Sequence, residues 1–558
     1  LHRMDRKTLT GFILIGAILL LWPSYIELIS PPEKTSKDPV LPDTAVIEKY
    51  AEKIPESPQN IVGAQRSVES KTLTVDGGSY TAKINNLAGG SVVSFDLKKH
   101  LKSSEQDLNL IDNQNNKNLV VSFINQSGEV VVLDEYWSIV SGGSSVLSKE
   151  NPSSSITFET SYVGKPITKK LTFYYNSYEV DVDVNLREIK ESSLDEKYVL
   201  SWVGGLPEHE GSQDAMFMES LVSQVGSIES FRIGSAGFFG SSNTKNIGEE
   251  SKKYVGLVDF AGYRTKYFGV FFVPEKSDMV EIYKYPSTDR AGVDINISQG
   301  INLEKNKLYL GPLDYSSIEG LNVGLEEKIL GWQWLSSVSW LVYSIMILLY
   351  SLIPNYGVVV ILFAVLIKLV TYPLMAKQLR SSKKMQEISP IMNNIKTKYK
   401  NNPTLQQQKM AALFQEHKIN PLAGCLPLLI QMPILMSVFM VFRNTIEFRG
   451  ESFFLWISDL SAADTLFSLG EIPINILPFL MSASMYYTMK LSSATQPAGG
   501  DPAQEATQQM MKYMFPGMMF FLFYSFPSGL NLYYLCFNLM QIAQQKIINN
   551  EKTETVRK

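Results

Sequence analysis

The chain has 558 residues, so we expect several structural units rather than one domain. Its formal net charge of −4 at pH 7 argues against a nucleic-acid-binding protein. Only two cysteines occur, Cys425 and Cys536, and both lie in apolar stretches, which excludes a disulfide framework as the basis of the fold.

An apolar run over residues 9–29 opens the chain and follows several basic residues. Positive charge before a hydrophobic segment favours a cytoplasmic N-terminus, and the run is long enough to span a membrane. A cleaved signal peptide is the alternative, but no small-residue cleavage pattern closes the run. We therefore predict a transmembrane anchor over residues 1–30. Prolines among charged residues then indicate a periplasmic linker over residues 31–60.

Residues 61–330 have the pattern of a β domain. Short β-branched and aromatic runs are separated by clusters of glycine, serine and asparagine. The alternation Val180-Asp181-Val182-Asp183-Val184 is typical of a strand with one buried face. Strands are predicted at 91–97, 118–124, 129–133, 156–162 and within 169–186, and a buried central strand at 263–275. The pattern favours a large antiparallel all-β domain, with a sandwich as the expected architecture.

Two apolar runs follow, at residues 334–353 and 358–374. The first has a polar stripe of serines at every seventh position. The next segment, residues 376–420, carries nine lysines and arginines against two glutamates, so we place it in the cytoplasm. An odd number of crossings must then separate it from the external β domain. Residues 331–355 are therefore predicted to lie along the outer surface as an elbow helix, and residues 356–375 to cross the bilayer.

Residues 421–548 contain four further predicted spans. They lie at 422–442, 474–489, 513–526 and 530–548. The connecting loop at 444–472 is acidic, as expected for an external loop. Several spans are near or below the usual length of about 20 residues, which indicates either a tilted bundle in a thinned bilayer or boundaries that extend further.

The chain is thus predicted to be a polytopic α-helical membrane protein with six spans. Both termini are predicted to lie in the cytoplasm, and the C-terminus forms a tail over residues 549–558. Residues 31–355 lie in the periplasm, and most of them belong to the all-β domain.

One charge lies deep within a predicted span, at Lys368. It follows Tyr356 by twelve residues, a helical rise of about 18 Å, and an amine near the bilayer centre costs roughly 2.5–3.5 kcal/mol. The side chain either snorkels to the inner surface or faces a water-filled cavity between helices, and its depth favours the cavity. Polar residues on other spans that could join it are Gln431, Asn531, Tyr533, Tyr534 and Asn538. Each of these alone is more typical of an interhelical hydrogen bond.

Methionines crowd two of the later spans at helical spacing. Such stripes belong to ordinary packing or to a surface that accepts varied apolar helices, and the sequence does not separate these interpretations. The candidates for a surface along which substrates slide are Met432, Met436, Met440, Met511, Met514, Met518 and Phe515.

The cytoplasmic segment is expected to form a helical hairpin. Asn402 is the predicted N-cap and Pro403 the first helical residue of its second helix. Its positive charge suits anionic lipid or ribosomal RNA, although a solvated hairpin explains the charge equally well. The basic candidates are Lys383, Lys384, Lys396, Lys398 and Lys400.

The sequence carries no signature of an enzyme. There is no HExxH motif and no P-loop, and the Ser528 segment lacks the partners of a serine protease. The four histidines are scattered. We therefore expect no catalysis, no metal site, no cofactor and no DNA partner.

Several ordered motifs in residues 334–550 resemble the YidC family of membrane insertases. These motifs are IKLVTYPL at 367–374, NPLAGCLPLLIQMPI at 420–434, LWI at 455–457 with DLSA at 459–462, and FPSGL at 526–530 with LYY at 532–534. The β domain resembles the Gram-negative form of the family through TKYF at 265–268 and LGP at 310–312.

The resemblance implies a chaperone of the bacterial inner membrane that inserts and folds integral membrane proteins, alone or with the Sec translocon. It also implies a β-supersandwich in the periplasm and a five-helix core around a hydrophilic groove, open to cytoplasm and lipid and sealed on the far side. The implied partners are nascent membrane proteins, the ribosome, the Sec translocon and anionic lipid.

The groove cation of the best-known members is arginine, and here Lys368 occupies that position. Lysine keeps the charge but lacks the planar fork that binds carboxylate in a bidentate manner. Ala364, one turn earlier, replaces a hydroxyl often found there.

Two other classes of protein are weighed against an insertase. A solute transporter with Lys368 as counter-charge would show internal repeats with broken helices, which the sequence lacks. An envelope scaffold or carbohydrate-binding module would act through its β domain. Deletion of residues 60–325 would abolish the activity of such a module and spare most of that of an insertase.

Overall fold

The structure is a computed structural model. It describes residues 68–101, 108–111, 117–233, 248–286, 291–302, 305–326, 335–417, 426–470, 472–493 and 510–550. The predicted anchor at 1–30, the linker at 31–60 and nearly all of the tail at 549–558 lie outside these residues. Residues 60–497 and 511–558 belong to one compact unit.

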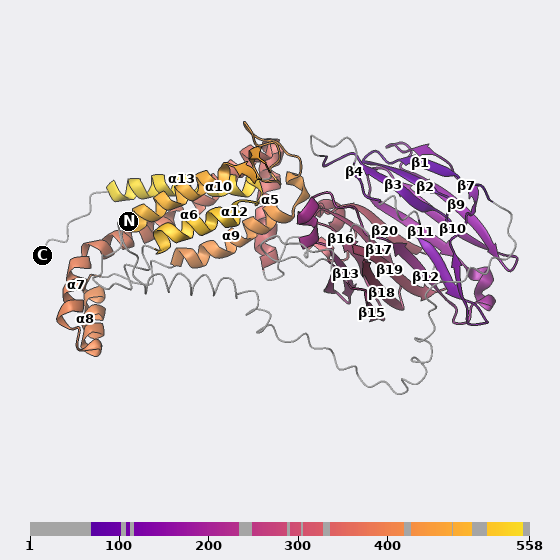
Figure 1. Ribbon diagram of the computed structural model, residues 1–558, viewed down its shortest axis with the longest axis horizontal. Coiled ribbons are helices and arrows are strands. Elements are labelled where there is room, and N and C mark those ends of the chain that lie inside the picture. The colour runs from indigo at the N-terminus through magenta and orange to yellow at the C-terminus, as the bar shows by residue number, and fades with distance from the viewer. Residues whose placement is uncertain are drawn as a thin grey trace. The chain divides into compact units, whose positions relative to one another are not determined.

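The first part of this unit is a β domain with three sheets (Figure 1). A five-stranded sheet has the order β4 (Leu108–Asn109), β3 (Ser91–Leu97), β2 (Tyr80–Asn85), β1 (Thr72–Asp76), β8 (Ser145–Val146). A nine-stranded sheet has the order β14 (Ser227–Arg232), β13 (Glu219–Gln224), β16 (Phe260–Arg264), β17 (Phe268–Pro274), β20 (Lys305–Pro312), β11 (Glu179–Asn185), β10 (Lys165–Tyr174), β9 (Ser153–Tyr162), β7 (Ser138–Ser141). A six-stranded sheet has the order β15 (Glu250–Val255), β18 (Met279–Pro286), β19 (Ala291–Gly300), β12 (Lys197–Val203), β5 (Val120–Ile124), β6 (Val130–Leu133).

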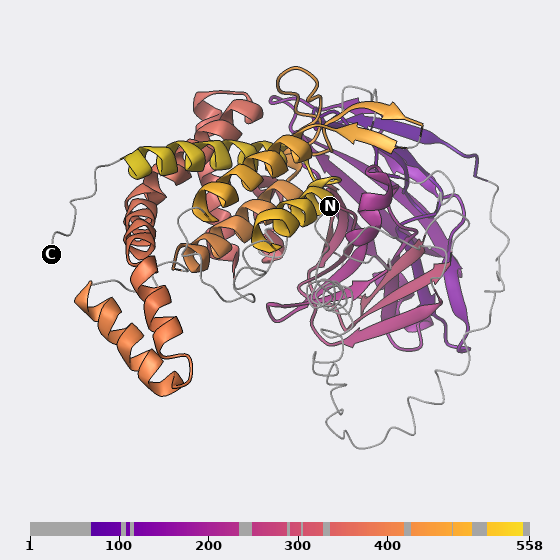
Figure 2. The same ribbon diagram turned by 60° about the vertical axis from the view of Figure 1, so that its left-hand side comes forward.

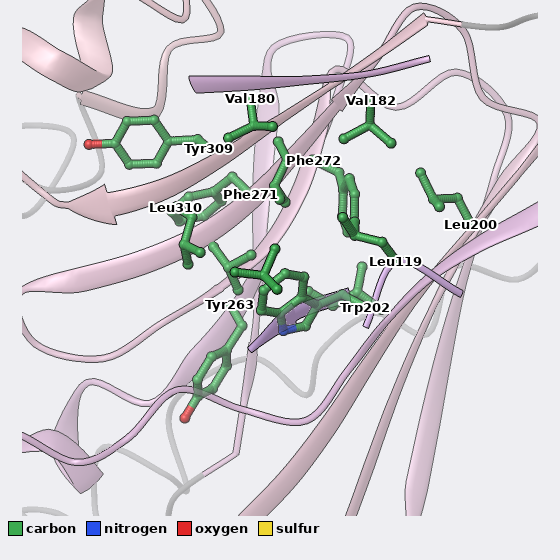
Figure 3. Close-up of a cluster of buried hydrophobic side chains, with 14 of the residues drawn as sticks. Leu119, Val180, Val182, Leu200, Trp202, Tyr263, Phe271, Phe272, Tyr309 and Leu310 are labelled. Atoms are coloured by element: carbon green, nitrogen blue, oxygen red, sulfur yellow. The ribbon is translucent and has the colours of Figure 1, made fainter. Parts of the chain in front are cut away.

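One continuous hydrophobic core joins the three sheets. In β11 the valines at 180, 182 and 184 are buried and the aspartates between them are not, as the alternation predicts. In β12, Leu200 and Trp202 point inward in the same way. Figure 3 shows Val180, Val182, Leu200 and Trp202 in one cluster with Phe271 and Phe272. The prediction of a large all-β domain is confirmed.

The prediction of one central strand at 263–275 is wrong in the number of strands. The chain forms two antiparallel strands there, β16 and β17, separated by a tight turn at residues 265–267. The turn closes because the Thr265 N–H donates to the Phe268 carbonyl at 2.9 Å. Both strands are almost entirely buried, so neither shows the alternation that would have marked it as a separate strand, although the polar Arg264-Thr265-Lys266 lies at the turn.

The second part of the unit is helical. Its helices are α5 (Ser336–Leu352), α6 (Tyr356–Glu387), α7 (Ser389–Lys398), α8 (Pro403–Glu416), α9 (Leu426–Asn444), α10 (Leu477–Ser493), the π-helical turn η7 (Met510–Met514), α12 (Phe515–Phe523) and α13 (Ser528–Asn550). Short helices precede or interrupt them: η1 (Arg187–Ser192), η2 (Gly211–Met216), α3 (Tyr315–Glu319) and η6 (Ile446–Phe448).

The helices follow the predicted segments with shifted ends. The span at 356–375 continues without a break into the cytoplasmic segment as α6, and the next helix begins at Ser389. The Asn402 side chain accepts a hydrogen bond from the Leu405 N–H and caps α8, whose first residue is Pro403, as predicted. Among the described residues, one helix, Tyr356–Met385, is by itself long and apolar enough to cross a membrane. The count of six spans stays a prediction.

The loop after α9 contributes to the interior of the β domain. Ile446 belongs to the β core. The side chain of Arg449 is fully buried, and its Nε lies 2.8 Å from the Glu210 carboxylate. Arg449 also donates to the His100 carbonyl, and its guanidinium lies 5.4 Å from the centre of the Phe268 ring. An arginine buried in this way is stabilised by the acid and the carbonyl together.

A second buried cation lies inside the β domain. The Lys169 side chain on β10 is fully buried and donates to the carbonyls of Ala88 and Leu119 at 2.5 and 2.6 Å. Its amine lies 5.4 Å from the centre of the Trp137 ring. Burial lowers the pKa of Lys169 to about 7, because the charged form loses its hydration.

This shift predicts a pH dependence of stability. Between the folded pKa of about 7 and the ordinary value of 10.5, the unfolded chain binds the proton that the folded chain has lost. Stability therefore rises with pH in this window, by up to about 1.4 kcal/mol per pH unit. We expect the melting temperature of Lys169→Met to rise less between about pH 7 and pH 9 than that of the unmodified protein. Circular dichroism measures the melting temperature at each pH. The control is Lys170→Met, because Lys170 is an exposed neighbour. Parallel pH profiles for all three proteins would contradict a titrating Lys169.

Candidate functional site

Lys368 belongs to α6, and its side chain lies between α6 and α13. Only 5% of this residue is exposed, and its Nζ donates a hydrogen bond to Oε1 of Gln541 on α13. The amine also lies 4.7 Å from the centre of the Phe537 ring, where the face of the ring attracts a cation. The side chain therefore points to polar and aromatic groups of a neighbouring helix rather than away from the protein.

The sequence analysis missed Gln541. A signal was present, because amides recur along α13 at Asn531, Asn538 and Gln545, seven residues or two helical turns apart, and all three are buried. Gln541 lies between the last two of them. Amides repeated along an apolar helix predict a face that packs against other helices through hydrogen bonds.

The polar candidates named from the sequence do not all gather around Lys368. Asn531 donates to the carbonyls of Phe523 and Phe526 and so holds the turn between α12 and α13. Asn538 donates to the Ser484 hydroxyl on α10 at 3.3 Å. Their roles in the structure are contacts between helices.

Tyr533 and Tyr534 lie about one turn before Phe537 on α13. Tyr533 is fully buried, Tyr534 is partly exposed, and their rings contact each other. Gln431 lies on α9, but its side chain is outside the described residues.

Four hydroxyls on the helices of this part are buried without a hydrogen-bond partner among the described residues. They belong to Ser339 on α5, Ser437 on α9, Ser482 on α10 and Tyr533 on α13. A buried polar group without a partner costs free energy, so such groups are normally satisfied by water or a ligand. The core therefore offers polar atoms beyond Lys368 and Gln541.

An aromatic cluster fills the core between Lys368 and the start of α6. The rings of Phe442 and Phe448 stack at 4.7 Å, Tyr356 meets Phe448 at 5.1 Å, and Phe363 meets Tyr533 at 5.9 Å. Large rings in contact exclude water. The cluster separates the amine from the outer end of the helices.

The outer loop and the turn between α12 and α13 close that end with hydrogen bonds. The N–H of Ser528 donates to the Ala462 carbonyl at 2.6 Å, and the N–H of Gly529 donates to the Leu460 carbonyl at 3.0 Å. The Ser528 hydroxyl donates to the Asp459 carbonyl. A Cβ on Gly529 would lie 3.0 Å from the Phe442 ring, so the close approach favours glycine. The DLSA and PSG motifs thus meet in space.

Asp464 fixes the start of α10 to the same loop. Its Oδ2 accepts hydrogen bonds from the backbone N–H groups of Ile476 and Leu477 at 2.9 and 2.6 Å. The indole N–H of Trp456 donates to the same oxygen at 3.1 Å. A carboxylate that accepts from the first N–H groups of a helix acts as its cap.

The methionine candidates differ in exposure. Met432 on α9 is about half exposed, at 49%, whereas Met440 on the same helix is buried. Met436, Met514, Met518 and Phe515 are partly exposed, and the side chain of Met511 is outside the described residues.

The helical hairpin of α7 and α8 has a small apolar core of its own, formed by Ile388, Met392 and Leu413. Lys384, Lys398 and Lys400 are exposed, and Lys396 is partly exposed. Lys383 donates to the Asn549 carbonyl at the end of α13. Among the described residues, no group of His, Cys, Asp and Glu side chains is arranged to hold a metal ion.

Two family models match the chain. The one described as 60Kd inner membrane protein matches residues 348–555, and the one described as YidC periplasmic domain matches residues 72–343. Together they cover the helical part and the β domain.

Two full-length relatives carry the name membrane protein insertase YidC. The protein of Chlorobaculum parvum is 32% identical over 98% of this chain and 94% of its own. That of Prosthecochloris aestuarii is 32% identical over 98% of this chain and 95% of its own. A crystal structure of an active YidC insertase with its first transmembrane domain resolved is 20% identical and covers 87% of this chain and 93% of its own. Its TM-score of 0.33 is too low to support an argument.

The Asp464 contacts predict a matched pair of variants. Asp464→Ala leaves the N–H groups of Trp456, Ile476 and Leu477 without their acceptor, and each unpaired buried donor costs about 1–3 kcal/mol. We expect a melting temperature several degrees lower, measured by differential scanning fluorimetry in detergent. Asp464→Asn keeps a side-chain oxygen and should lose less. If the alanine variant melts like the unmodified protein, the cap does not stabilise the outer loop.

Proposed function

The chain belongs to the YidC family of membrane protein insertases. We propose that Lys368 and Gln541 receive polar parts of client polypeptides during insertion. The protein is a membrane protein insertase of the bacterial inner membrane, and its clients are membrane proteins. The part played by individual residues is our proposal.

The observation that carries the proposal is the neutral partner of the buried amine. Gln541 offers a carbonyl oxygen and no charge. In the part of the chain that the structure describes, Lys368 takes part in no salt bridge. A cation bound by a neutral amide keeps its attraction for an anion, whereas one paired with an internal carboxylate would be largely neutralised.

An acidic group in a client tail could therefore replace Gln541 at the amine. The tail must pass a hydrocarbon layer in which each bare charge is strongly disfavoured. A positive site partway across shortens the distance over which the tail lacks a polar partner. The apolar part of the client would leave between α9 and α12 toward lipid, past Met432, with apolar transfer and the membrane potential as driving terms.

The closed outer end gives this route a direction. The aromatic cluster and the hydrogen bonds between residues 459–462 and the Ser528 turn fill the far side. We propose that clients reach the site from the cytoplasm, so that a site closed on the other side accepts them without opening a path for ions. We propose six spans with both termini in the cytoplasm, as the charge of the loops predicts.

The exposed lysines of the cytoplasmic hairpin support a surface contact with the ribosome or with anionic lipid. Lys384, Lys398 and Lys400 have their charges available to an anionic partner. We propose that the hairpin makes this contact. We also propose that the helical core cooperates with the Sec translocon.

Replacement of Lys368 tests the charge. We expect Lys368→Ala to lower the insertion of clients with acidic tails roughly tenfold, since removal of about 1.4 kcal/mol of attraction has that effect on an equilibrium. Lys368→Arg keeps the charge and should retain most of the activity. The measurement is protease protection of radiolabelled clients in proteoliposomes, with a neutral-tailed client as control. Equal insertion by the alanine variant and the unmodified protein would remove the cation from the mechanism.

A second variant tests the neutral partner. Gln541→Glu places a carboxylate beside Lys368 and converts the pair into an internal ion pair. We expect insertion of acidic-tailed clients to fall, because a client acid must now displace a charged competitor. Gln541→Asn, which keeps a neutral amide, is the control. Higher insertion by the glutamate variant would show that a free cation is not what clients require.

A further inference from the structure

The external loop after α9 ends in a small β-hairpin that the proposed function does not use. Strands β21 (Thr465–Leu469) and β22 (Ile472–Asn475) pair in antiparallel fashion. All five residues of β21 are exposed. Figure 2 shows the two strands as orange and gold arrows that extend beyond the ends of the helices.

The pairing gives the hairpin two different faces. Phe467 pairs with Ile474, and Ser468 pairs with Pro473. Paired residues point to the same side of a sheet, and successive residues point to opposite sides. Phe467, Leu469 and Ile474 therefore share one face, and Ser468 and Pro473 lie on the other.

The apolar face is only partly covered by the described residues, and Ile474 is its partly buried member. Phe467 is 49% exposed and Leu469 is 64% exposed. The segment TLFSL carries no charge to oppose association. An exposed apolar strand in water is prone to aggregation, so such a face normally meets a partner.

The base of the hairpin is firmly attached to two helices. The Thr465 hydroxyl donates to Oδ1 of Asn475 at 2.8 Å, and Nδ2 of Asn475 donates to the Tyr524 carbonyl at the end of α12 at 2.6 Å. The Tyr524 hydroxyl donates in turn to the Pro473 carbonyl. The cap from Asp464 to the first residues of α10 lies directly beside them. The hairpin is thus held at the outer ends of α10 and α12.

This position identifies the partner as lipid. The helices α10 and α12 are two of the proposed spans, so the surface of the bilayer lies at their outer ends, where the hairpin begins. Tryptophan and tyrosine at the base, Trp456 and Tyr524, are the residues enriched at that level of a membrane. We propose that the face of Phe467, Leu469 and Ile474 inserts into the outer leaflet, at the boundary between headgroups and acyl chains, and anchors the external loop there. The inference rests on the proposed spans.

Spin labels on the full-length protein in lipid nanodiscs test this anchor. Cys425 and Cys536 are first replaced by serine. Single cysteines then carry a nitroxide at Leu469→Cys on the apolar face or Ser468→Cys on the opposite face. Phe479→Cys on the exposed side of α10 controls for the spans, and Val225→Cys in an exposed turn of the β domain controls for water.

The measurement compares collisions of each label with oxygen, which concentrates in lipid, and with a water-soluble nickel chelate. We expect the ratio of oxygen to nickel collisions to be several-fold higher at Leu469 and Phe479 than at Ser468 and Val225. A label at Leu469 that behaves like Val225, while Phe479 remains in lipid, would overturn the anchor and leave the spans intact.

Two other outcomes are also decisive. If Leu469 and Phe479 both collide mainly with nickel, the proposed spans themselves are wrong. If Leu469 is shielded from both reagents, protein covers the face, and the lipid anchor is overturned in favour of a docking surface.

Discussion

The helical part of this protein is organised around the burial of one amine in apolar surroundings. A lysine among hydrophobic helices is tolerated when other side chains replace its hydration, and Lys368 finds an amide and an aromatic face on α13. Other contacts also join α6 and α13, because Gln544 donates to the Tyr372 carbonyl and Lys383 donates to the Asn549 carbonyl. The partner of Lys368 is a neutral amide, which accepts a hydrogen bond from the amine without neutralising its charge. The aromatic cluster then protects the outer side of the same site.

Local features were predictable from the sequence. The alternation around Val182 gave the correct buried face of β11, because side chains of a strand point alternately to its two sides. Asn402 and Pro403 marked the start of α8 through a cap that depends on adjacent residues alone. The position of Lys368 within an apolar helix followed from composition.

Features that depend on distant pairing were not predictable in the same way. Gln541 lies 173 residues from Lys368, and only the packing of α6 against α13 brings them together. The split of residues 263–275 into two strands was concealed because both are buried and so lack alternation. The hairpin at 465–475 was assigned to an acidic loop, since its short strands are exposed and their pairing depends on contacts with Tyr524.

The ion pair between Arg449 and Glu210 has a consequence for biosynthesis. A chain made from its N-terminus delivers Glu210 to the periplasm 239 residues before Arg449 is synthesised. During that interval the β domain lacks both the cation and Ile446, which belongs to its core. Its last packing step must wait until α9 and the loop that follows it have been made. Translation therefore sets the time at which the β domain can finish folding, and a fully packed β domain requires that α9 has already been made.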